Sequence, residues 1–146
     1  MGYPDRTMLP DHLDAATLGR AVVADGRLKM LRETLGITRS AMSELLHTNP
    51  VRYADWERRP DIKLRPATAE RIGRFYYAAT QEIMLLEDAG LDVANMVPFH
   101  VVATLLGVPQ ELLLQWYRDG RIEAIDTGIL GLWVPRRVLD ELRRGR

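Results

Sequence analysis

One stretch of the sequence, between Pro66 and Gly90, constrains the fold more than any other. Its apolar residues recur at steps of 4, 3, 4 and 3, as Ile72, Tyr76, Ala79, Ile83 and Leu86. This spacing places them on one face of an α-helix, and proline at the start and glycine at the end are common helix boundaries. The pattern predicts a helix from Ala67 to Asp88, with a length of about 33 Å. A helix of that length can connect two small domains.

Residues 1–66 are expected to form a small domain of short helices. Thr38 and Asn49 can each accept a hydrogen bond from a backbone N–H at a helix start, and Pro50 suits a first helical position. Gly26 is expected to interrupt the first helical stretch. The predicted helices cover residues 14–35, 39–46 and 50–57.

The helical pattern starts again after Gly90. Two helices are followed by a β-hairpin whose turn contains Gly128 and Gly131, and no other part of the chain carries a strand signal. The expected fold is therefore mainly α: an N-terminal domain over 1–66, a connecting helix over 67–90 and a C-terminal domain over 91–146. The predicted elements of this last domain are helices 98–106, 109–119 and 136–144 and strands 122–126 and 132–135.

Composition argues against several classes of function. The chain has no cysteine, and its three histidines lie too far apart for a metal site. Its carboxylates are scattered, so we expect no acid–base catalysis, no cofactor and no enzyme activity. No apolar run approaches the roughly 18 residues that a membrane span needs, and the start of the chain lacks the layout of a signal peptide. A soluble protein of the bacterial cytoplasm is expected.

Charge is balanced over the whole chain but not along it. Lys+Arg and Asp+Glu are 20 each, yet residues 49–74 hold 7 basic and 4 acidic side chains, and residues 136–146 hold 5 and 2. Only Lys29 and Lys63 are lysines, and arginine suits phosphate and guanine contacts better than lysine. Two separated basic patches are compatible with binding of double-stranded DNA.

A first motif covers residues 31–46 and continues over 49–59. It contains Leu35-Gly36-Ile37-Thr38 before one helix and Trp56-Glu57-Arg58 at the end of the next. This resembles the lambda-repressor/Cro-like helix-turn-helix, although His47 stands where the turn normally has glycine. The resemblance implies that the second helix of the pair enters a major groove. The expected DNA-binding residues are Arg39, Ser40, Asn49, Val51, Arg52, Asp55 and Arg58.

A second motif covers residues 97–142. It contains Val102 to Pro109, then Trp116-Tyr117-Arg118-Asp119-Gly120-Arg121-Ile122, the hairpin and a last helix. It is similar to the excisionase/MerR-like winged helix-turn-helix, although the hairpin tip is apolar at Ile129 and Leu130. The resemblance implies that the helix before Asp119 lies in a major groove and that the hairpin touches DNA backbone or minor groove.

The reading face of this second motif follows from its helical pattern. Leu112, Leu113, Trp116 and Tyr117 are expected to be buried, as are Trp56 and Trp133, which leaves four polar residues facing outward. Glutamine suits adenine, and glutamate suits the amino group of cytosine. Two arginines at the start of the last helix are expected to contact phosphate. The candidate DNA-binding residues here are Gln110, Glu111, Gln115, Arg118, Arg136 and Arg137.

Two unlike DNA-reading modules on one chain suggest binding as a monomer to an asymmetric site. This layout resembles the immunity repressors of temperate actinobacteriophages, which implies repression of transcription and maintenance of lysogeny. Pairing of two chains through the helix 67–88 is the competing possibility.

Other functions remain open. The first is an excisionase-like directionality factor, which bends DNA for an integrase. The second is an antitoxin or protein-binding adaptor that meets its partner through the hairpin tip and the long helix. The first motif could also be an ordinary helical bundle.

Overall fold

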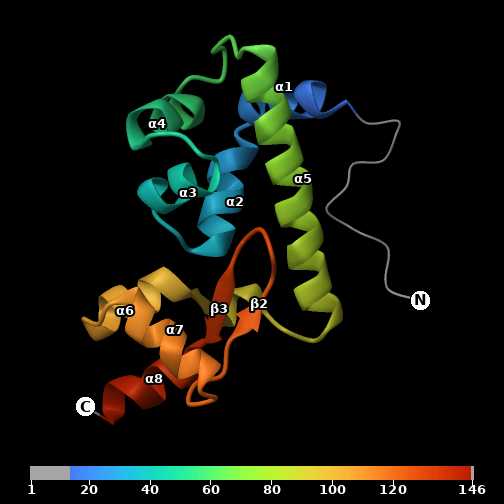
Figure 1. The fold of residues 1–146 in the computed structure, drawn as a ribbon. Helices are drawn as coiled ribbons and strands as arrows, with labels where there is room; N and C mark the ends of the chain where they lie inside the picture. Colours follow the sequence, from blue (N-terminus) through green and yellow to red (C-terminus); the bar gives the residue numbers. More distant parts are fainter. Residues whose placement is uncertain (1–13, 146) are drawn as a thin grey trace.

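The computed structural model describes residues 14–145, so His12 and Arg146 lie outside the described residues. The fold is mainly helical with one small antiparallel sheet, as expected (Figure 1). The first five helices are α1 (Ala15–Ala24), α2 (Arg27–Leu35), α3 (Arg39–Leu45), α4 (Pro50–Arg58) and α5 (Pro66–Asp88). They are followed by η1 (Val93–Asn95), β1 (Met96–Pro98), α6 (Phe99–Leu106), α7 (Gln110–Arg118), β2 (Ile125–Asp126), β3 (Leu132–Pro135) and α8 (Arg136–Arg144).

The predicted helix starts of the N-terminal part are confirmed by their hydrogen bonds. The Thr38 side chain accepts from the backbone N–H of Ala41, and Asn49 accepts from that of Arg52. Gly26 separates α1 from α2 with a φ of 72°, a left-handed conformation that costs glycine little. Local chemistry therefore determines where these short helices begin and end.

Helices α1 and α5 cross at a contact between backbones. A Cβ atom built on Gly19 would lie 1.8 Å from the carbonyl oxygen of Ala69, and one on Gly73 would lie 1.9 Å from that of Ala15. No side chain larger than hydrogen fits at either position. The pattern Ala15-x-x-x-Gly19 facing Ala69-x-x-x-Gly73 thus lets the long helix lie directly against α1.

The sheet has the strand order β1-β3-β2, with Val97 opposite Val134 and Ile125 opposite Trp133. Strand β1 was not expected, so the expectation of a lone hairpin is wrong. Three residues are too few to show an alternating pattern, and the strand forms because β3 pairs with it from far along the chain. The predicted strand 122–126 is also shorter, because only Ile125 and Asp126 pair.

Successive residues of the sheet point into two different hydrophobic clusters. Trp133 and Met96 belong to the cluster built by α1–α5, whereas Val134 and Val97 belong to a second cluster with α6, α7 and α8. Alternate side chains of a strand leave on opposite faces, so the sheet lies between the two clusters. The connecting helix is therefore not a free rod, since its residue Leu86 and the sheet share one cluster.

We expect Gly19→Ala to lower the free energy of unfolding by roughly 1–3 kcal/mol or more, because the methyl group overlaps a backbone carbonyl that cannot move alone. Chemical denaturation of the full chain measures the change. Gly145→Ala, where the nearest atom to the new Cβ is 3.5 Å away, is the matched control and should change little. Equal stability of the Gly19→Ala variant and the original protein would contradict this close approach.

Candidate nucleic-acid interface

The first candidate surface is the start of α4. Val51 is 74% exposed, and Arg52 beside it is also exposed. The Asn49 side-chain oxygen is occupied by the 2.7 Å hydrogen bond that caps the helix, which leaves its amide group as a donor. An arginine, an amide and an apolar side chain on one helical turn match the groups that contact guanine, adenine and the thymine methyl.

A buried ion pair fixes the orientation of α4. Arg32 on α2 donates from Nε to Glu57 at 2.6 Å and from Nη2 at 3.1 Å, while Arg39 at the start of α3 donates at 3.2 Å. The Glu57 side chain is only 3% exposed. Burial acts to raise the pKa of this carboxyl, but the hydrogen bonds from both arginines outweigh burial and keep the pKa below its ordinary value. Three helices are thus held at one carboxylate.

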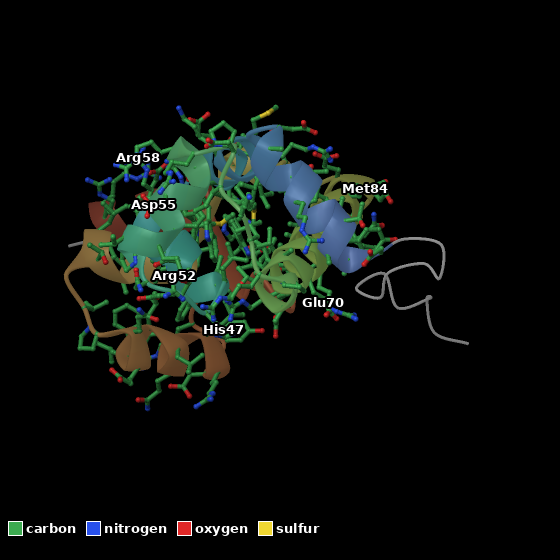
Figure 2. The ribbon with its side chains drawn as sticks, turned by 90° about the horizontal axis from the view of Figure 1, so that it is seen from above. His47, Arg52, Asp55, Arg58, Glu70 and Met84 are labelled. Atoms are coloured by element: carbon green, nitrogen blue, oxygen red, sulfur yellow. The ribbon has the colours of Figure 1, made fainter. Side chains whose placement is uncertain are left out.

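Other predicted residues of this surface interact with one another. Arg58 is exposed and forms an ion pair with Asp55, so the two charges largely cancel. Ser40 is exposed, and its carbonyl accepts a hydrogen bond from the Ser43 hydroxyl. Arg39 is exposed although it touches Glu57. Figure 2 shows Arg52, Asp55 and Arg58 in sequence along α4.

Two basic residues near α4, Lys63 and Arg65, lie outside the first motif and were not among the predicted DNA-binding residues. A surface cavity of about 380 Å³ is lined by Arg52 and Asp55 of α4 and by Lys63 and Arg65 of the segment before α5. Three of these four side chains are positive. The basic excess over residues 49–74 was the signal for them, but only the fold brings Lys63 and Arg65 beside Arg52.

The second candidate surface is the outer face of α7. Gln110, Glu111, Gln115 and Arg118 are all exposed, as predicted. The expected burial of Leu112 is wrong, since it is 38% exposed. Consecutive helical residues point about 100° apart, and of the described residues of α7 only one, Leu113, is fully buried. Leu112 therefore joins the polar residues at the surface, in the way that Val51 does on α4.

The three tryptophans differ in how deeply they are buried. Trp56 and Trp133 are each 2% exposed and are core residues, as predicted. Trp116 and Tyr117 are only half-buried at the edge of the second cluster. They lie on the face of α7 that packs against this cluster, as predicted, but they are only partly covered because Leu113 is at the centre of that face.

Arg136 and Arg137 lie exposed at the start of α8, but their surroundings are not purely basic. Arg137 forms an ion pair with Glu123. Both arginines line a surface cavity of about 510 Å³ that also contains the acidic residues Asp92 and Asp140. The electrostatic potential here is therefore weaker than the sequence cluster alone indicates.

The hairpin tip does not stand free, in contrast to what the second resemblance implies. The backbone N–H groups of Ile129 and Leu130 donate to the Glu82 carboxylate of α5 at 2.7 and 3.1 Å. Glu82 is 4% exposed, and burial raises its pKa despite these two hydrogen bonds. Leu130 is buried in the same place. Because its backbone donors are occupied by Glu82, the tip cannot give them to phosphate.

Helices α4 and α7 belong to two helix pairs that lie one above the other in the view of Figure 1. Figure 1 shows the α3–α4 pair above the α6–α7 pair, with α5 along the opposite edge. The structure therefore brings the predicted residues into two separate surfaces, one on α4 and its surroundings and one on α7. It does not merge them into one continuous site.

No protein-family model matches the chain, and no match was found among curated proteins or among solved structures. Within residues 14–145, none of the helices is long and apolar enough to cross a membrane. The same residues contain no cluster of side chains suited to holding a metal ion.

Lowering the pH should weaken the contribution of Glu57 to stability. Its pKa in the folded protein lies below the ordinary value of 4.5, so folding favours the ionised form. The contribution is present above about pH 4.5 and is lost as the pH falls through the folded pKa. We expect Glu57→Gln to cost roughly 3 kcal/mol at neutral pH and to lose less stability than the original protein on acidification.

Urea denaturation at a series of pH values measures both effects. Glu87→Gln changes an exposed carboxylate at the end of α5 and is the control. Parallel stability curves for the original protein and the Glu57→Gln variant below pH 4.5 would contradict the ion-pair role.

Proposed function

We propose that this protein binds double-stranded DNA sequence-specifically and acts as a repressor of transcription. The proposal rests on the presence of two similarly built surfaces in one chain, one on α4 and one on α7. Helix α4 follows the shorter helix α3, and α7 follows the shorter helix α6, in each case after a short turn. Both α4 and α7 expose polar residues suited to base edges. A helix presented in this way can enter a major groove.

The chemistry of the two surfaces supports complementary roles. The α4 surface is basic, with Arg52, Lys63 and Arg65 close together, and suits guanine and phosphate. The α7 surface has two glutamines, one glutamate and one arginine, a set that suits adenine and cytosine edges more than phosphate. Val51 and Leu112 add an exposed apolar side chain to each surface, which suits a thymine methyl group.

Because the surfaces are unlike, the expected DNA site is asymmetric and is bound by one chain. Two identical chains would call for a palindrome, whereas two different readers do not. A protein bound to such a site at a promoter keeps RNA polymerase away from it and so represses transcription. The resemblance to phage immunity repressors supports a role in maintaining lysogeny, with the protein acting in the host cytoplasm.

A footprint on the DNA that flanks the protein's own gene tests this function. We expect protection of a non-palindromic site at about 0.1 M salt, with one chain per duplex by sedimentation. Protected sites clustered beside an attachment core would favour a directionality factor instead. Absence of any sequence preference would overturn the proposal and favour a protein-binding adaptor, and two chains on a palindrome would overturn the monomer.

Arg52→Ala should cost roughly 1–3 kcal/mol of binding free energy and relax the preference at one base pair, because a guanine contact is lost. Titration against the footprinted site and its single-base variants measures this. Arg20→Ala removes an exposed arginine on α1 and should leave the preference unchanged. Equal weakening on specific and random DNA would show that Arg52 contacts only the backbone.

Arg136→Gln should reduce the slope of log K against log salt by about 1 and leave the preferred sequence unaltered, because it removes one phosphate contact. Binding measured at several salt concentrations gives the slope, and Arg20→Gln provides the baseline. A changed base preference would rule out a purely phosphate role.

A further inference from the structure

The two halves of the protein are joined by more than the chain connection after α5. Leu130 of the hairpin and Trp133 of β3 are buried in the cluster formed by α1–α5. Ile37 and Ala41 lie across the joint and line with them a pocket of about 160 Å³. All four of these side chains are buried, so apolar packing joins the hairpin to the N-terminal helices.

Glu82 gives this joint a specific polar contact. Both of its carboxylate oxygens accept a backbone N–H from the tip, and hydrogen bonds to an ionised group are about twice as strong as neutral ones. Breaking them would leave the buried Glu82 carboxylate and the buried N–H of Leu130 without these partners. Any other seating of the hairpin on α5 therefore carries a large penalty.

The tip is shaped to receive this carboxylate. Gly128 has a φ of 93°, and a Cβ atom built there would lie 2.9 Å from Oε1 of Glu82. Glycine is thus required both for the backbone conformation and for the space. The two residues that fit together, Glu82 of α5 and Gly128 of the hairpin, are 46 positions apart in the sequence.

We propose that Glu82 is a positioning residue that holds α4 and α7 in one fixed arrangement, so that the protein accepts a single spacing between the two DNA segments it contacts. The inference rests on the proposed function. Helix α4 belongs to the body that contains α5, through Trp56 and Ile72. Helix α7 belongs to the body that contains β3, through Leu113 and Val134. Strand β3 joins the two bodies through Trp133 and Val134, and the Glu82 contact adds a second, polar link that fixes the angle between them.

The consequence for DNA recognition is geometric. One inserted base pair moves the second segment by about 3.4 Å and turns it by about 35° around the duplex. A rigid protein loses one of its two DNA contacts when this happens. Two loosely linked modules can both stay bound to the displaced segments, so they keep most of the affinity that comes from having both modules on one chain.

The first test requires no DNA. Because the chain has no cysteine, Asp61→Cys and Glu141→Cys place two spin labels uniquely at exposed positions, one on each body. We expect a narrow distance distribution in the original background and a broad one after Glu82→Ala. Glu87→Ala, an exposed glutamate on the same helix, is the matched control. Gly128→Ala should broaden the distribution from the hairpin side.

The second test uses the footprinted site with one base pair inserted between its two protected segments. We expect the original protein to lose about tenfold or more in affinity and Glu82→Ala to lose less than about threefold relative to its own uninserted site. Circular dichroism confirms folding, and Glu82→Gln, which keeps one acceptor oxygen, replaces Glu82→Ala if that variant unfolds.

The outcomes separate the two proposals. A distance distribution that stays narrow in both Glu82→Ala and Gly128→Ala overturns the positioning role, as does an original protein that tolerates the insertion. Failure of the original protein to bind any DNA site overturns the proposed function and the spacing rule with it. The distances between the spin labels would then still show whether Glu82 fixes the arrangement of the two bodies relative to each other.

Discussion

The whole arrangement depends on β3, the strand that both hydrophobic clusters share. Trp133 leaves one face of the strand and completes the cluster of α1–α5, while Val134 leaves the other and completes the cluster of α6–α8. Because neighbouring side chains leave the strand on opposite faces, β3 ties the two clusters to each other at one place. The Glu82 contact extends the same constraint to the hairpin tip.

This constraint leaves the outer helices free to carry function. Apolar burial is concentrated at the sheet, at the α1–α5 crossing and beneath α3 and α6. The starts of α4 and α7 contribute little to it, so residues such as Val51 and Gln110 are exposed and unconstrained by packing. Surfaces of this kind can change their recognition chemistry without loss of the fold. The neutral net charge fits the same division, because positive side chains gather locally around α4.

Local signals were sufficient for most elements and for part of the candidate site. Helix caps such as Thr38 and Asn49 act within three residues, and the periodicity of residues 67–88 needs only the helix itself. The outward direction of Gln115 and Arg118 followed from the same periodicity. Leu112 was misplaced because an apolar residue at the edge of a helical face is buried only if a neighbour covers it. Nothing in the local sequence specifies that neighbour.

The sequence by itself determined where helices begin and end, which side chains can face inward, and which chemical groups the two candidate surfaces carry. These properties depend on interactions between residues a few positions apart. Only the tertiary structure decided that β1 exists, that Lys63 and Arg65 lie beside Arg52, and that the hairpin tip donates to Glu82. Each of these depends on segments that are remote in the chain, and the preference of one for the other arises from burial and hydrogen bonding that exist only after the chain has folded.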